Sequence, residues 1–387
     1  MKKLQFGTTK CIKMHIGKTC NSSICKDMYV GDWKIDVITD PVTGQVSQSE
    51  YFAGEVKMGV KEEQMYLGDL LSANGKHAKN VACRKGKGLG VINDIMQIIQ
   101  STYFGKYHFE VALVLRESLL LSSLLLNSEA WVNLTDQDVR KLEQTDEILL
   151  SKILGCDANT NNIFKYLELG IAPLRFEIMK RKILFLQYIL QQDKKSMIYK
   201  VFEATCTDPV KNDFVQTCKK YLEVLNLNLS FVEIGQMSKW KRKKLVKDHI
   251  KVAAFNYLIK EKNKPGKNGK QSKIACIEYE KLEIQEYLYE RNENTKTSKF
   301  IFKARAKMLD IKMHKKWKYD DTLCVGCTQR DETGEEMLTC EYFESDDKIP
   351  TNLSYEWFYS KEVSEIIGCA KVMMQKLKVR QKILDTG

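Results

Sequence analysis

The sequence has little proline and little arginine, and it lacks a long apolar run. With five prolines in 387 residues, loops are marked instead by glycine, asparagine and charge. The longest charge-free part of the most apolar stretch, Ser118–Ser128, is far shorter than the roughly 20 residues that span a bilayer. Because no basic-then-apolar leader opens the chain, we expect an intracellular protein without a membrane partner, whose 12 cysteines are mostly reduced.

Positive charge is abundant and comes mainly from lysine. The 62 Lys and Arg residues exceed the 50 Asp and Glu residues, so the formal net charge is +12, and only ten of the 62 are Arg. Such a surplus is typical of proteins that bind polyanions, because Lys and Arg neutralise phosphates and release counterions. A general bias toward lysine at solvated positions explains the composition equally well.

Hydrophobic patterning predicts a β-rich start and a helical remainder. Residues 1–66 contain short apolar runs separated by the turn-like cluster Asp40–Gly44. From about Lys79 the period becomes helical, and one face carries Ile92, Ile95, Met96 and Ile99. We therefore expect an α+β fold that is predominantly helical.

The middle of the chain contains clear helix signals. Phe109–Trp131 is interpreted as one helix that is buried on most sides. Thr135 with Asp138 three residues later is typical of a capping box, and Gly155 is a suitable helix end.

A strongly basic helix is predicted from Lys239 to Lys260, capped by Ser238. It is followed by the lysine- and glycine-rich loop 261–273 and by a second basic segment, 296–317. The helix is a solvated amphipathic face, a nucleic-acid contact or a helix that lies on a membrane surface. Its apolar stripe is Val246, Ile250, Ala253, Ala254, Tyr257 and Leu258, and its opposite face carries Lys243, Lys244, Lys247 and Lys251.

A cysteine cluster is the most chemically specific feature. Cys324 and Cys327 form a C-x-x-C pair able to grip one soft ion, and Cys340 supplies a third thiolate. A structural zinc site needs four donors, but Glu336 stands where a histidine is expected, and His314 lies ten residues before the pair. The segment is thus a zinc knuckle, a decayed one or a set of unrelated cysteines.

Other chemical motifs are weak. The five histidines are widely separated and no G-x-S-x-G elbow occurs, which gives hydrolytic chemistry no support. The segment Gly86–Gly90 fits neither the dinucleotide nor the P-loop template. It is either a flexible joint or a basic loop in which Lys85 and Lys87 meet a nucleic-acid backbone at a helix N-terminus.

Three segments, taken in order, carry a family resemblance. Leu4–Gly17 contains F-G-x-x-K-C-x-x-M-x-I-G, and Met65–Gly75 contains Y-L-G-D. A long helical run follows, including Asn127–Trp131 and Tyr166–Arg175. Together they resemble the carboxy-terminal part of reverse transcriptases encoded by LINE-type (non-long-terminal-repeat) retrotransposons, over residues 1 to about 345.

The resemblance implies an order of domains. It implies a palm remnant at 1–76 with exposed apolar edges, a helical thumb at 77–205, a basic helical region at 206–318, a zinc-knuckle-like segment at 319–345 and a helical tail at 346–387. In the family the knuckle reads C-x-x-C…H-x-x-x-C, so Cys324, Cys327 and Cys340 match and Glu336 takes the histidine position. Residues 341–387 carry no P-D nuclease motif.

The resemblance also bears on activity. The family polymerises with palm carboxylates that hold two divalent ions, usually Mg²⁺, and those carboxylates lie upstream of the first matched segment. Lys10 matches a position near the leaving pyrophosphate, so a general-acid role is implied for it only in an intact enzyme. We therefore expect a fragment that cannot copy nucleic acid but binds RNA and DNA, such as element RNA or a template–primer duplex.

The binding is expected to be largely independent of base sequence, because lysines are point charges suited to phosphates. Nuclear residence is implied by the resemblance, with Lys241–Lys244 as a compatible import signal. A host protein reusing the helices as an interaction scaffold, and an incomplete gene model of an active enzyme, are the alternatives. The residues expected to contact nucleic acid are Lys85, Lys87, Lys239, Lys243, Lys244, Lys247 and Lys251.

Overall fold

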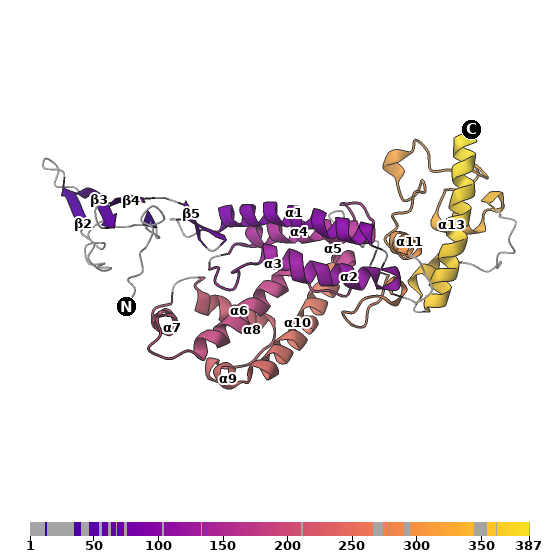
Figure 1. Ribbon diagram of the computed structural model, residues 1–387. Helices are drawn as coiled ribbons and strands as arrows, with labels where there is room; N and C mark the ends of the chain where they lie inside the picture. The colour runs from indigo at the N-terminus through magenta and orange to yellow at the C-terminus, as the bar shows by residue number, and fades with distance from the viewer. Residues whose placement is uncertain are drawn as a thin grey trace.

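The protein is predominantly helical, which confirms the expected fold class. In Figure 1 the strands lie at one end, helices α1 to α10 form a central body, and α11 and α13 belong to a lobe at the other end. The computed structural model describes residues 12–13, 35–39, 46–53, 56–60, 63–66, 68–72, 76–102, 104–132, 134–209, 212–265, 274, 276–289, 295–343, 354–360 and 362–386.

Among the described residues the strands form two small sheets, and all of these strands precede residue 73. The first has the order β1-β4-β3-β2, in which β2, β3 and β4 are antiparallel neighbours and β1 is parallel to β4. The second is the hairpin β5–β6. The expected turn at 40–44 and Lys10 lie outside the described residues. The bounds are β1 Ile12–Lys13, β2 Ile35–Thr39, β3 Val46–Ala53, β4 Val56–Val60, β5 Glu63–Tyr66 and β6 Asp69–Ser72.

A buried ion pair fixes the hairpin to the first helix, α1 (Ala78–Ser101). Arg84 Nη2 donates to Asp69 Oδ1 at 2.6 Å and to the Gly68 carbonyl at 2.8 Å. Asn80 Nδ2 donates to the same carboxylate at 3.1 Å, and its own Oδ1 accepts from the Leu70 amide. Asp69 of the Y-L-G-D segment, at the start of β6, therefore ties the β5–β6 hairpin to α1.

Helix α4 (Asp136–Leu154) begins and ends where the sequence predicts. The Thr135 hydroxyl accepts from the Asp138 amide at 3.1 Å, and the Asp138 side chain returns the contact, so the capping box is confirmed. Gly155 adopts the left-handed conformation (φ 63°) that ends many helices and favours glycine.

The prediction of one helix over Phe109–Trp131 is correct as far as Leu124, with a π turn inside it, and wrong beyond that residue. The chain forms α2 (His108–Leu115), a π-helical turn (Arg116–Leu120), the short α3 (Leu121–Leu124) and then turns. Arg116 begins the π turn and donates from Nε and Nη2 to both carboxylate oxygens of Asp146, at 2.6 and 2.7 Å. The π turn therefore coincides with a buried bidentate ion pair that joins it to α4.

The interpretation of Gly86–Gly90 as a joint or a phosphate loop is also wrong. These residues lie inside α1, eight residues or more beyond its start at Ala78, so no helix N-terminus is available there. Gly88 faces α3, because a Cβ atom at this position would lie 2.6 Å from Leu124 Cδ2. Close helix packing, rather than flexibility, accounts for this glycine.

The basic helix is α10 (Lys239–Lys262), and Ser238 caps it by accepting from the Lys241 amide. Val246, Ile250, Ala254 and Leu258 of the predicted stripe are buried, whereas Ala253 and Tyr257 are half-buried. The helix packs on α5 and α6. The other helices of the body are η3 Gly105–Tyr107, α5 Asn162–Glu168, α6 Leu174–Leu190, α7 Met197–Thr207, α8 Phe214–Val224 and α9 Phe231–Gln236.

The C-terminal lobe contains α11, α12 and α13 and several single 3₁₀ turns. Helix α13 packs against α11 and α12. The predicted helical character of the C-terminal tail agrees with α13. The bounds are η5 Glu286–Leu288, α11 Thr295–Arg305, η6 Lys316–Lys318, α12 Gly334–Thr339, η7 Glu341–Phe343, η8 Tyr355–Tyr359 and α13 Val363–Thr386.

A buried carboxylate joins the body to this lobe. Glu168, the last residue of α5, is fully buried and accepts from Arg305 at 3.1 Å and from the hydroxyls of Tyr279 and Tyr287. The Gln285 amide donates to the Glu168 carbonyl at 2.9 Å. Side-chain and main-chain bonds therefore converge on one residue.

Gly170 lies beside this joint and has no room for a side chain. Its φ is +64°, and an added Cβ atom would lie 2.0 Å from the Glu283 carbonyl carbon. We expect Gly170→Ala to separate the segment 283–285 from α5 and to destabilise the lobe by about 2 kcal/mol or more. Amide hydrogen exchange should rise in α5 and around Glu283. Unchanged protection there would contradict this role, and Gly86→Ala, at an open helical position, is the matched control.

His108 gives the joint a pH dependence. Burial, followed by the charge of Lys299 on α11, lowers the pKa of His108 from 6.5 to about 4, and its Nε2 atom is buried without a hydrogen-bond partner. The unfolded chain thus takes up this proton at a higher pH than the folded protein does. Stability contributed by the neutral ring is present above pH 6.5 and is lost as the pH falls toward 4.

We therefore expect His108→Gln to melt at a temperature less sensitive to pH across this window than the native protein does. Melting curves measured through the window test this. Parallel curves for the two proteins would show that His108 does not govern the pH response.

Candidate metal centre

The C-x-x-C turn is held in place by a small network of main-chain bonds. The Cys324 amide donates to the Arg330 carbonyl at 2.7 Å, and the Thr328 amide donates to the Cys324 carbonyl at 2.9 Å. Gly326 lies at the tip, where a Cβ atom would approach Tyr342 Cβ to 2.7 Å. The turn therefore presents both thiols toward the segment that carries Cys340.

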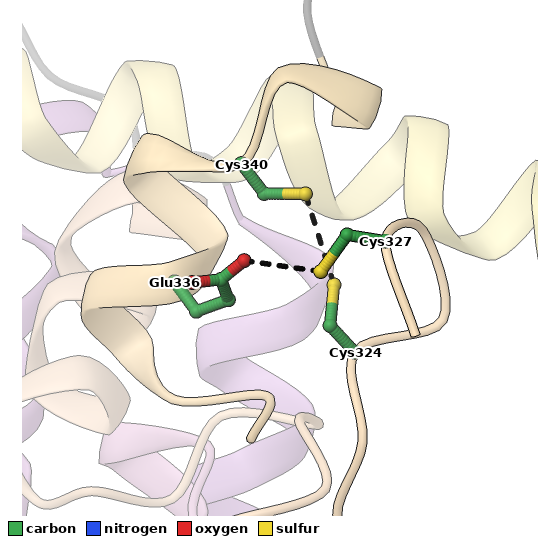
Figure 2. Close-up of side chains that lie close together, drawn as sticks. All are labelled: Cys324, Cys327, Glu336 and Cys340. Carbon is green, nitrogen blue, oxygen red and sulfur yellow. Dashed lines mark hydrogen bonds between the residues drawn. The ribbon is translucent and has the colours of Figure 1, made fainter. Parts of the chain in front are cut away.

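Four side chains converge at this turn (Figure 2). The Sγ atoms of Cys324 and Cys340 are 3.8 Å apart, and Cys327 Sγ is 3.3 Å from Glu336 Oε1. One donor atom from each of the four residues lies within 4.8 Å of every other. The three predicted thiols and the glutamate at the histidine position are thus brought together. His314 is not part of the group and makes an edge contact with the Tyr355 ring instead.

Helix α12 determines where Glu336 points. The Thr333 hydroxyl caps the helix by accepting from the Glu336 amide at 3.0 Å. Cys340 follows the last residue of α12, and its amide donates to the Glu336 carbonyl at 2.8 Å, which keeps the two residues together. The carboxylate is buried, with its second oxygen 3.6 Å from Arg330 Nη1.

The thiols have different environments. Burial raises the pKa of Cys324, and burial raises the pKa of Cys340 to about 12. Hydrogen bonds from the main-chain amides of Gln329 and Arg330 lower the pKa of Cys327. Cys327 is thus the thiol that most readily becomes a thiolate.

The donor set fits zinc. Tetrahedral zinc bonds sulfur at about 2.3 Å, which separates two sulfur ligands by about 3.8 Å, and this is the spacing of Cys324 and Cys340. Carboxylate oxygen is an accepted fourth ligand. A bound zinc ion would be held by these four residues and would supply structural cross-linking.

A second set of residues braces the centre, and the sequence interpretation missed it. Glu332 is fully buried and accepts from Arg380 Nε at 2.8 Å, from the Lys312 amide at 2.9 Å and from the Val325 amide at 3.3 Å. Lys376 Nζ donates to the Leu338 carbonyl at 2.6 Å. In the sequence, the feature that could have indicated this set is the spacing of Lys376 and Arg380, two basic residues four apart on one side of a helix.

The predicted nucleic-acid contacts lie on two helices. Lys239, Lys243, Lys244, Lys247 and Lys251 are all exposed on α10. On α1, Lys87 is exposed and Lys85 is half-buried. These two helices pack on different neighbours, α10 on α5 and α6, and α1 on α3 and α4. The structure therefore gathers five of the seven lysines on one helix.

Comparisons with protein-family models, curated proteins and solved structures returned no match. None of the described helices combines the length and apolar composition that crossing a membrane requires.

We expect the purified protein to contain one zinc ion per chain, measured by elemental analysis. Cys340→Ser should lose most of the metal, because three donors bind zinc far more weakly than four. Glu336→His should retain it. Cys369→Ser is the matched control, since Cys369 is a buried thiol of the same lobe outside the group. Native protein without zinc, unable to take it up after reduction, would identify a decayed site.

Proposed function

We propose that this chain binds nucleic acid, as the thumb and post-thumb part of a LINE-type reverse transcriptase. Helix α10 would hold RNA or DNA through backbone phosphates. Zinc at the Cys324–Cys340 centre would hold the C-terminal lobe together. The proposal extends to the nucleus as the place of action, because enzymes of this kind prime on chromosomal DNA.

The exposed lysines of α10 carry the proposal. Lys239, Lys243, Lys247 and Lys251 follow one another at four-residue intervals, which are steps of about 6 Å along a helix. Lys241 and Lys244 widen this line, and Asp248 is the single acidic residue between 239 and 251. A linear array of exposed cations with little counter-charge suits a phosphate backbone.

The rest of α10 supports a binding role because the helix is firmly anchored. Its buried stripe packs on the body, and Lys262 at its far end donates from Nζ to the Ile277 carbonyl. His249 Nδ1 lies 2.9 Å from the Leu225 carbonyl oxygen. The lysines therefore project from a rigid support, which limits the entropy lost on binding.

The test replaces Lys243, Lys244, Lys247 and Lys251 by Glu. We expect affinity for RNA and for DNA, measured by fluorescence anisotropy, to fall by about 100-fold or more at moderate salt. The dependence of log Kd on log salt should also flatten by about one for each phosphate contact removed.

The matched control replaces four exposed lysines outside α10 and so changes the net charge equally: Lys194, Lys195, Lys200 and Lys220. It should retain most of the affinity. Equal losses of affinity in both variants would show that the net charge of the protein, and not the position of the α10 lysines, determines binding. Full retention in the α10 variant would favour the interaction-scaffold alternative.

A further inference from the structure

The three thiols of the metal centre differ in their access to solvent. Cys324 is fully buried and Cys340 is 6% exposed, whereas Cys327 is half-buried. A small reactant in solution therefore meets Cys327 first. In a metal-bound centre this sulfur is a thiolate, because coordination deprotonates a thiol, and the thiolate is the form that reacts with peroxides.

Cys324 contacts both of the other sulfur atoms. Its Sγ atom is 3.8 Å from that of Cys340, and side-chain hydrogen bonds join it to Cys327 as well as to Cys340. Figure 2 shows the sulfur atoms of Cys324 and Cys327 ending side by side, within the 4.8 Å that holds for every pair of donor atoms in the group. A sulfur that is oxidised at Cys327 thus has a second thiol within reach.

The C-x-x-C turn is short enough to close into a disulfide. Residues 325–327 form a turn, and the Thr328 amide donates to the Cys324 carbonyl at 2.9 Å. The first and fourth residues of a tight turn have Cα atoms less than about 7 Å apart, which is the range that a disulfide requires. The bond would therefore form within the turn and would leave Cys340 as a free thiol.

Such a bond would leave too few donors for a metal ion. A disulfide sulfur is not a thiolate, and the thiolate is the form that binds zinc. After the bond forms, only Cys340 and Glu336 of the group remain as donors. Two donors bind zinc far more weakly than four, so the ion would leave the centre.

We propose that Cys327 is an oxidation site for hydroperoxides, and that Cys324 converts the oxidised sulfur into a disulfide within the C-x-x-C turn, with release of a bound zinc ion. This chemistry goes beyond the proposed function and does not depend on nucleic-acid binding. Its zinc readout depends on a loaded metal centre, whereas its disulfide readout does not.

Hydrogen peroxide, the simplest hydroperoxide, shows how the reaction balances. In the first step the Cys327 thiolate attacks one peroxide oxygen, the O–O bond breaks, and the products are a sulfenic acid and hydroxide. In the second step the Cys324 thiolate attacks the Cys327 sulfur, the S–O bond breaks, and a second hydroxide leaves. The two sulfur atoms together lose two electrons, and the peroxide takes them up.

The experiment treats native protein with a small excess of hydrogen peroxide, blocks the remaining thiols with an alkylating agent and maps the cysteines by mass spectrometry. Cys324 and Cys327 lie in one tryptic peptide, 319–330, and Cys340 lies in the next. We expect the first peptide to lose two hydrogen atoms and to escape alkylation. A chromogenic chelator should detect one zinc ion released for each disulfide formed, and a thiol reductant should restore zinc uptake.

Cys206 provides a control within the same chain, because it is exposed on α7 and lies outside the group. If exposure alone governed oxidation, Cys206 would react before Cys327. We expect Cys327 to be modified about tenfold faster or more, because a coordinated sulfur is a thiolate and an ordinary free thiol is mostly protonated at neutral pH.

Two variants test the separate roles. Cys327→Ser should form no disulfide in peptide 319–330 and should release zinc about tenfold more slowly per bound ion. Cys324→Ser should be oxidised at Cys327 to a sulfinic acid, because the thiol that resolves the sulfenic acid is missing. Cys369→Ser, which changes a buried thiol of the same lobe outside the group, should behave as native protein does.

The outcomes separate the oxidation site from the metal centre. A disulfide between Cys324 and Cys340 with Cys327 left free, or oxidation of Cys206 before Cys327, would overturn the oxidation site. Native protein without zinc would contradict the metal centre alone, and the mapped disulfide would then decide whether the oxidation site exists. If the serine variants fail to fold, mapping in native protein gives the same decision.

Discussion

The buried carboxylate of Glu168 is the interaction on which the arrangement of body and lobe depends. A carboxylate with no exposed surface is stable only when its oxygens are paired. Arg305, Tyr279 and Tyr287 satisfy them; the two tyrosines come from the segment that leads into the lobe, and Arg305 is the last residue of α11 in the lobe. Arg305 also donates from Nη1 to the Phe358 carbonyl at 2.6 Å, so the same guanidinium connects α5, α11 and the turn before α13.

Helix α13 in turn positions the metal centre through its buried cations. The ion pair between Arg380 and Glu332 lets one carboxylate also hold the amides of Lys312 and Val325, which fixes the path of the chain into and out of the C-x-x-C turn. The four potential ligands therefore meet because of contacts made by other residues. Metal binding would therefore cross-link a C-x-x-C turn whose conformation the surrounding lobe already fixes.

Much of the helical architecture is predictable because its signals are local. The capping box at Thr135, the end at Gly155 and the buried stripe of α10 each depend on residues within a few turns. The π turn in the 109–131 stretch is different, since it coincides with the pair between Arg116 and Asp146, 30 residues apart. Glu336 illustrates the same limit. Spacing raised it as a doubtful ligand, and folding brings its oxygen beside Cys327.

Arginine and lysine occupy different places in this structure, and the difference has a chemical consequence. The arginines of the described chain mostly serve internal ion pairs, whereas the outer face of α10 is made of lysine. Acylation neutralises an ε-amino group but leaves a guanidinium charged. An acetyltransferase or a simple anhydride acting on the surface would thus remove the charge of α10 while the interior electrostatics of the fold stayed intact. Acylation of the surface would therefore change the charge of α10 and leave the arginine ion pairs of the fold charged.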